Sequence, residues 1–153
     1  MPRHKTVRPL EAHLGFWLRF VSNHVSQAFS RRLAAHEVSV AEWVVLRELL
    51  EQDGALPSDL AERLGMTRGA ISKLADRLEA KGLASRRTDK VDRRYQALRI
   101  TAKGRALVPA LAALADENDA EFFDHLTRKE RERVVAIMKE IVRRHGLRTT
   151  PVD

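Results

Sequence analysis

The sequence predicts a mainly α-helical fold that carries one small β-hairpin. Its middle part reads, in order, as a helix and tight turn over Leu60–Thr67, a second helix from Arg68 to Lys81, a Gly82-Leu83 break and a basic hairpin from Arg86 to Ile100. A helix with a polar, basic outer face fits the major groove of DNA, and a basic loop beside it can reach the adjacent backbone or minor groove. Both parts in this order favour a DNA-binding lobe.

Composition agrees with that interpretation. A chain of 153 residues predicts one domain, here over 1–153, with a substantial core. The 28 Lys and Arg exceed the 21 Asp and Glu, which favours polyanions, acidic partners or anionic membranes, although a solubilising surface has the same composition. The absence of cysteine excludes disulfides, thiolate metal sites and cysteine redox switches. The basic N-terminus lacks an apolar segment after it, so we expect a cytoplasmic protein with no membrane partner.

The N-terminal part predicts a long helix from Leu10 to Leu33. Its apolar residues recur at helical spacing, with a second stripe starting at Phe16 and Phe20. The first stripe consists of Leu10, Leu14, Trp17, Val21, Val25 and Ala28. A helix that is apolar on more than one side needs several neighbours, which suggests a subunit interface formed by residues 10–35.

The next part predicts two short helices. Ser39-Val-Ala-Glu42 matches a capping box, in which both side chains satisfy free backbone N–H groups, so a helix is expected from about Val40 to Glu51. Its inward residues are Trp43, Leu46, Leu49 and Leu50. Asp53-Gly54 ends this helix, and Pro57 suits the first turn of the next, which ends at Leu64-Gly65.

The helix from Arg68 to Lys81 is the candidate recognition helix. Thr67 should cap its start, and Gly82 should end it in the left-handed conformation. Its inward stripe is Ile71, Leu74, Ala75 and Leu78, and its outer face carries Arg68, Gly69, Ser72, Lys73, Asp76 and Arg77. Arg68 can bond guanine in a bidentate manner, whereas Thr67 and Lys73 suit phosphate contacts. Taken alone, the same pattern also describes an ordinary solvated amphipathic helix.

The hairpin is predicted to have strands at Ala84–Thr88 and Tyr95–Ile100. The loop between them exceeds a two-residue turn and should project. The segment from Arg86 to Arg94 carries five basic and two acidic residues, and Arg94 suits a narrow minor groove. Asp92 would bond loop N–H groups or orient an arginine. A charged hairpin with no partner is the alternative.

Two long helices should complete the chain. Thr101 caps the first, which runs to about His125, is bent by Pro109 and places Leu107, Val108, Leu111 and Leu114 on one face. A second capping box, Thr127-Arg-Lys-Glu130, opens the last helix, which ends at His145-Gly146. Its expected inward residues are Val134, Ile137, Met138 and Ile141.

From about Leu10 to Gly146 the chain resembles the MarR family of winged helix-turn-helix regulators. The resemblance is most specific at Leu78-Glu-Ala-Lys-Gly82-Leu83, Arg86, Asp92-Arg93-Arg94 and Leu98-Arg-Ile-Thr101-Ala-Lys-Gly104. It implies a winged helix-turn-helix lobe over 39–101, a homodimer held by the helices of 10–35 and 102–146, and repression at palindromic operators. It also implies a small aromatic or phenolic effector that releases the DNA.

The resemblance places the family's Asp-x-Arg wing motif on Asp92 and Arg94. Gly69 departs from the serine, proline or bulkier residue expected early in the recognition helix. With the residue-level interpretation, the expected DNA-binding residues are Thr67, Arg68, Gly69, Ser72, Lys73, Arg77, Arg86, Asp92, Arg93 and Arg94.

Other sites are predicted less specifically. Trp17, Trp43 and Arg47 could line a pocket for an aromatic acid, with core packing as the alternative for both tryptophans. None of the six histidines belongs to a sequence cluster that completes a metal site, so no metal and no cofactor is expected. The chain also lacks a nucleophile elbow, a P-loop and a His-Glu zinc motif, so it is not expected to be an enzyme.

Three functional hypotheses remain at this level. A ligand-responsive dimeric transcription factor should bind a palindrome tightly over a weaker background. An architectural DNA-binding protein should bind any duplex with similar affinity. A small enzyme or protein-binding module with an incidental basic face should show no salt-sensitive DNA binding.

Overall fold

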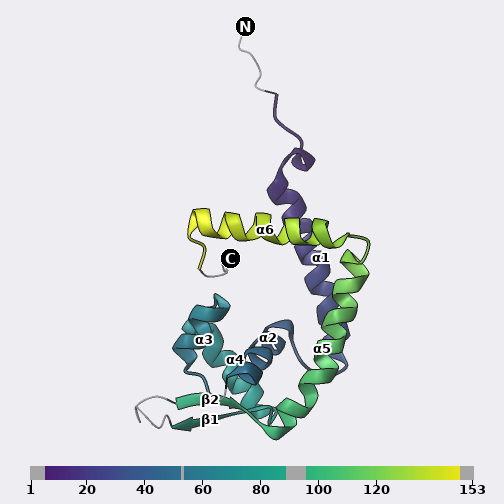
Figure 1. Cartoon of the computed structure of the whole chain (residues 1–153). Helices are drawn as coiled ribbons and strands as arrows, with labels where there is room; N and C mark the ends of the chain where they lie inside the picture. The colour runs from purple at the N-terminus through teal and green to yellow at the C-terminus, as the bar shows by residue number, and fades with distance from the viewer. Residues whose placement is uncertain (1–5, 53, 89–95, 149–153) are drawn as a thin grey trace.

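The computed structural model describes residues 6–52, 54–88 and 96–148. The elements, in order, are η1 (Leu10–Ala12), α1 (Leu14–Ala34), α2 (Val40–Glu51), α3 (Pro57–Leu64), α4 (Arg68–Ala80), β1 (Ala84–Thr88), β2 (Gln96–Ile100), α5 (Ala102–Phe123) and α6 (Arg128–His145). Figure 1 shows a lobe of α2, α3, α4 and the hairpin, from which α1 and α5 extend side by side, while α6 crosses their far end. The predicted fold class, mainly α with one β-hairpin, is confirmed.

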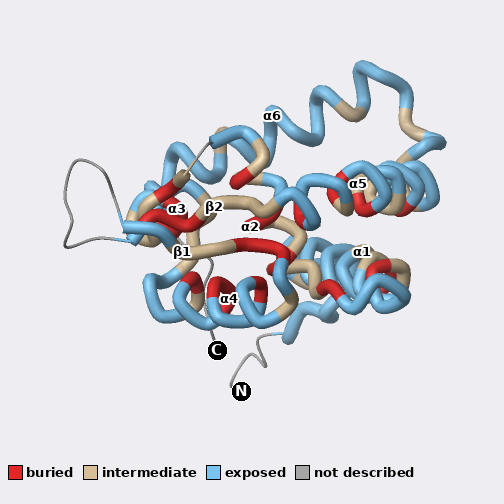
Figure 2. The backbone as a smooth tube through the Cα atoms, turned by 90° about the horizontal axis from the view of Figure 1, so that it is seen from below, coloured by how far each residue is buried: buried red, intermediate tan, exposed pale blue. Residues whose placement is uncertain are grey.

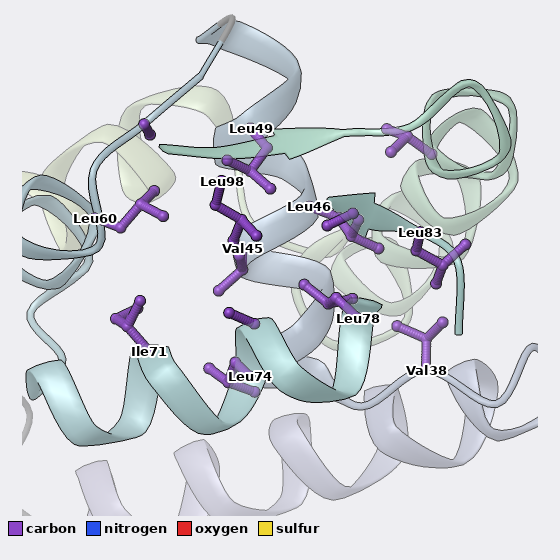
Figure 3. Packing of buried hydrophobic residues seen from close by; sticks show 14 of the residues in the cluster. Val38, Val45, Leu46, Leu49, Leu60, Ile71, Leu74, Leu78, Leu83 and Leu98 are labelled. Atoms are coloured by element: carbon purple, nitrogen blue, oxygen red, sulfur yellow. The ribbon is translucent and has the colours of Figure 1, made fainter. Parts of the chain in front are cut away.

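The core lies inside this lobe, against the inner face of α4. Leucine and isoleucine side chains from α2, α3, α4 and β2 meet there, as Figure 3 shows. The largest fully buried side chains are Leu33, Val45, Leu46, Leu49, Leu60, Ile71, Leu78, Leu98 and Leu111. Burying each of them contributes about 1.5–3 kcal/mol relative to exposure. The buried stripe predicted for α4 is therefore confirmed, and it fixes which face of α4 points outward.

The N-terminal helix begins later than predicted. Leu10–Ala12 forms a 3-10 turn, His13 is extended at φ −101° and ψ 124°, and the α-helix starts at Leu14. The extended backbone of His13 interrupts the i to i−4 hydrogen bonds that a continuous helix needs. Within α1 only Ala28 and Leu33 are buried, so the excess of apolar residues noted in the sequence lies largely uncovered along its first half.

A polar cluster joins α1 to α5. Asn118 is buried and donates from Nδ2 to the carbonyl of Val25 at 3.2 Å. Arg32 donates from Nε to Oδ1 of Asn118 at 3.4 Å and also pairs with Glu117 and Glu121. Buried polar groups need such partners, so this cluster fixes how the two long helices lie against each other.

Of the two predicted capping boxes, the one at Thr127 is complete and the one at Ser39 is not. At Thr127 the reciprocal bonds are both present, because Thr127 Oγ1 accepts from the N–H of Glu130 and the Glu130 carboxylate accepts from the N–H of Thr127. Ser39 likewise accepts from the N–H of Glu42 at 3.1 Å, but the Glu42 carboxylate does not return to Ser39. It points into the protein instead and pairs with Lys81, so the full box predicted at Ser39 is wrong.

The remaining turns follow the prediction. Thr67 and Thr101 cap α4 and α5 through their hydroxyl groups, and Gly82 adopts φ 71° after α4. The hairpin is antiparallel, with Ala84 opposite Ile100. Ala55 adds an isolated bridge to Leu98 through two backbone bonds of 2.9 and 2.8 Å, which the sequence did not predict. This bridge attaches the segment before α3 to the hairpin.

The C-terminal helices both exist, but one prediction about them is wrong. Helix α5 continues through Pro109 and buries Val108 and Leu111, as expected. Helix α6 buries none of its residues, and its apolar stripe lies exposed rather than inward, as Figure 2 also shows. The residues concerned are Val134, Ile137, Met138 and Ile141, each 37–47% exposed. Helical spacing defines a stripe but not what covers it, and α6 lies away from the core of its own chain. Within the described residues no helix is both long and apolar enough to cross a bilayer.

Candidate nucleic-acid interface

Helix α4 presents a polar face on the outside of the lobe. Its inner residues are fully or almost fully buried, and burial alternates along the helix in Figure 2. All six residues predicted for the outer face are exposed, namely Arg68, Gly69, Ser72, Lys73, Asp76 and Arg77. The helix is therefore held by one side only, and the other side is available to a partner.

The start of α4 borders a hollow of about 550 Å³. It is lined by the start of α3, the first half of α4 and both strands of the hairpin. The lining residues are Leu56, Pro57, Ser58, Arg68, Ser72, Arg86 and Gln96. Because two arginines and two hydroxyl groups line it, this hollow suits a phosphate-bearing backbone next to the groove that α4 would enter.

Arg86 joins the hairpin to the outer face of α4. Its guanidinium forms ion pairs of 2.7 Å with both Asp76 and Glu79 and donates to the carbonyl of Ser72 at 3.3 Å. The hydrogen bond to Asp76, followed by the bond to Glu79, raises the pKa of Arg86 above its usual value, although partial burial opposes this. Arg86 thus neutralises Asp76, a carboxylate that would otherwise repel DNA from the centre of the recognition face. Its own contact with DNA stays a prediction.

The end of α4 is fixed by Lys81. The Lys81 ammonium donates to the carboxylate of Glu42 at 2.7 Å and to the backbone carbonyl of Glu37. The Glu42 side chain is 4% exposed, whereas that of Lys81 is 36% exposed. The backbone carbonyl of Lys81 accepts from Lys103 Nζ at 2.9 Å. Sequence analysis missed the ion pair between Glu42 and Lys81, because Glu42 looked like a capping residue and Lys81 lies 39 positions later.

Three of the predicted DNA contacts lie outside the described residues. These are Asp92, Arg93 and Arg94, in the segment between β1 and β2. The strands on either side of this segment are described, and Arg87 is exposed on β1. The lobe thus combines an outward recognition helix, a hollow bordered by Arg68 and Arg86, and a basic hairpin on neighbouring surfaces.

This arrangement has close relatives among known proteins. A family model described as MarR family matches residues 36–94. The solved structure of CouR from Rhodococcus jostii RHA1 bound to p-coumaroyl-CoA is 27% identical, with a TM-score of 0.78 over 96% of this chain and 100% of that one. The chain is thus similar to the MarR family over residues 36–94.

Two further relatives bear on DNA binding. The transcriptional repressor CouR bound to a 23-mer DNA duplex is 28% identical, with a TM-score of 0.80 over 87% of this chain and 94% of that one. The HTH-type transcriptional regulator TtmR from Methylorubrum extorquens (strain PA1) is 32% identical over 98 residues, which is 64% of this chain. The match spans half the length of TtmR.

The fold separates the two tryptophans proposed for a ligand pocket. Trp17 packs against Phe16 and Phe20, with ring centroids 5.3 and 6.3 Å away. Trp43 instead packs edge-on against Phe29 at 6.3 Å and lies at the margin of the core. Phe29 is twelve positions after Trp17 on the same helix, about 18 Å along its axis. One protomer therefore does not bring Trp17 and Trp43 together.

The third proposed pocket residue, Arg47, is exposed and pairs with Glu51 at 2.5 Å. A hollow of about 550 Å³ does exist between α1 and the start of α2, one helical turn before Trp43. It is lined by Asn23, His24, Ser26, Gln27, Ser30, Ser39, Val40 and Ala41. Its polar groups come mainly from α1, which sequence analysis had treated only as an apolar helix. Across the described ranges no group of three or more His, Asp or Glu is placed to hold a metal ion.

Proposed function

We propose that this chain is a sequence-specific DNA-binding transcriptional regulator without enzymatic activity, which acts in the cytoplasm as a ligand-responsive repressor. The observation that carries this proposal is the outward face of α4, which is exposed along its length and adjoins the hollow bordered by Arg68 and Arg86 and the basic hairpin. The match to the MarR family over residues 36–94 and the likeness to CouR, a repressor bound to a DNA duplex, support it. The proposed contacts are those predicted on α4 and the hairpin, including Asp92, Arg93 and Arg94.

The active form we propose is a homodimer. Residues 39–101 would bind DNA, and residues 10–35 and 102–146 would hold the two protomers together within a single domain. The support is the exposed apolar surface of α1 and α6, which comprises Leu14, Trp17, Leu18, Phe20, Val21, Val134, Val135, Ile137, Met138, Ile141 and Val142. A two-fold dimer places its recognition helices symmetrically, so it needs an inverted repeat with half-sites about 10–10.5 bp apart or a multiple of that.

Selection of bound fragments from genomic DNA, followed by footprinting, tests the proposal. We expect a symmetric footprint over an inverted repeat and an affinity for it that is roughly 10³-fold or more above that for random duplex at the same salt. Equal affinity for every duplex would instead make the protein an architectural DNA-binding protein. No salt-sensitive binding at all would leave the basic face without a nucleic-acid role.

Arg68 is expected to determine one base position in each half-site. Replacing Arg68 with alanine should relax the preference at that position by about 1–3 kcal/mol, because it removes a bidentate bond to guanine. Lys73→Ala is the matched control on the same face: it should weaken binding to all sequences and lower the salt slope by about 1. Binding of a randomised half-site library measures both. An unchanged preference in the Arg68 variant would exclude it as a base contact.

The effector we propose is a small aromatic or phenolic compound, bound near the hollow between α1 and α2. Trp43 and Arg47 on α2 stay the proposed ligand contacts, and CouR with p-coumaroyl-CoA is the related complex. Trp17 lies about 18 Å along α1 from Phe29, the neighbour of Trp43, so it would not touch the same small molecule within one protomer. Salicylate and simple phenols should quench Trp43 fluorescence in the Trp17→Phe variant and release DNA. Quenching without a change in DNA affinity would mean that the ligand binds both states equally and is not an effector.

A further inference from the structure

Gly69 has no structural reason to be glycine within this chain. It is the second residue of α4 and is exposed, and its backbone is not among the positive-φ glycines. A Cβ atom added to it would meet no atom within 4 Å. Glycine is, after proline, the least favourable residue in a helix. The fold would therefore accept a side chain here and gain stability from it.

Other glycines of the chain differ in this respect. Gly65, Gly82 and Gly146 have φ angles of 64°, 71° and 56°, where other residues are strained. At Gly104 an added Cβ would lie 2.2 Å from the carbonyl oxygen of Leu83, so packing requires glycine. Gly15 in α1 is the other open helical glycine within the described ranges.

Gly69 also occupies the outermost position of the recognition helix. At 100° per residue, the buried residues of α4 define a direction toward the core. Gly69 in the first turn and Ala80 in the last turn both lie within roughly 10° of the opposite direction. Arg68, Ser72 and Lys73 surround it on the exposed face. A partner that approaches the N-terminal half of α4 from outside therefore meets position 69 first, between the predicted base contact and the predicted phosphate contact.

We propose that Gly69 is the point of closest approach between the recognition helix and double-stranded DNA, and that the missing side chain sets how deeply α4 enters the major groove. This inference rests on the proposed function. A side chain at position 69 would touch the groove first and hold the helix away, so that Arg68 no longer reaches a base edge in bonding geometry. Glycine is used where another backbone or a ligand must come close, and DNA is the partner that fits this face.

Gly69→Ala and Gly69→Leu test the inference, because both gain helix propensity and differ in size. Each should raise the melting temperature by about 2–4 °C. Affinity for the operator selected with the parent should fall about tenfold for the alanine variant and at least a hundredfold for the leucine variant. Gly15→Ala is the control for helix propensity, because it makes the same change in α1, away from α4. Since Gly15 lies in the proposed dimer interface, light scattering first measures the mass of this variant; as a dimer it should keep the parent's operator affinity.

Two results would overturn the inference. One is operator binding by both Gly69 variants as tight as that of the parent, which would show that the groove has room for a side chain. The other is a lower melting temperature in Gly69→Ala, which would show that the fold itself needs the glycine. If the parent selects no DNA, the proposed function fails and this inference with it, whereas normal binding by the parent confines a negative result to Gly69.

Discussion

Replacing Met138 with aspartate should convert the protein to a monomer and reduce its operator affinity by at least about a hundredfold. Met138 lies on the exposed apolar stripe of α6 and is 47% exposed in the single chain. In the proposed dimer it would be covered, and an unpaired carboxylate in an apolar interface carries a large desolvation cost. A monomer then binds one half-site only and loses the gain of about 10²–10⁴ that linking two binding sites gives.

Light scattering after size exclusion measures the mass, and a gel shift with the selected operator measures the binding. Ala136→Asp is the matched control, because it adds the same charge to the same helix at an exposed position about 200° away around the axis. It should remain a dimer and bind DNA. A dimeric Met138→Asp protein with the parent's affinity would place the interface elsewhere. Truncating α1 is a poorer test, because it removes Leu33 and Ala28 from the core.

Replacing Lys81 with methionine should lower the free energy of unfolding by about 3 kcal/mol. The change leaves the carboxylate of Glu42 buried without its cation, and breaking a buried ion pair from one side costs about 3–5 kcal/mol. We expect the low end of that range, because the Lys81 side chain is 36% exposed. The same change frees the end of α4 from the Glu37 carbonyl, so operator affinity should also fall.

Urea unfolding followed by circular dichroism measures the stability. Adding Glu42→Leu to the Lys81 variant should recover most of the loss, because an apolar pair can replace a buried ion pair. Lys73→Met serves as a control on the same helix: Lys73 is exposed and its loss should affect DNA binding but not stability. If Lys81→Met stays within about 0.5 kcal/mol of the parent, Lys81 does not hold α4 in place.

Sequence analysis succeeded where the cause of a structure is local. The caps at Thr67, Thr101 and Thr127 and the end of α4 at Gly82 depend on residues within one turn, and all four are confirmed. The buried stripe of α4 was equally predictable, because helical periodicity alone places its four residues on one side.

It failed where a residue has distant partners. Glu42 was expected to cap its own helix, but Lys81 offers a cation that the spacing could not reveal. Arg86 was expected to point at DNA, and the structure adds two carboxylates of α4 to its surroundings. Trp17 and Trp43 were placed in one pocket, although the length of α1 separates their aromatic neighbours. In each case the missing information is which surfaces of separate elements meet.

Lys81 holds the C-terminal end of α4, so a tilt of the helix about that end would displace its N-terminal end most. The helix is about 20 Å long. Glu37, Glu42 and Lys103 hold its C-terminal end, and Arg86 contacts it at Ser72, Asp76 and Glu79. A tilt of about 5° at the C-terminal end moves the Arg68 end by roughly 2 Å, which is enough to break a hydrogen bond to a base. The hollow between α1 and α2 ends at Ala41, next to Glu42. A molecule bound in that hollow would lie beside the C-terminal end of α4. A small tilt of α4 there would displace Arg68, at the other end of the helix, by a larger distance.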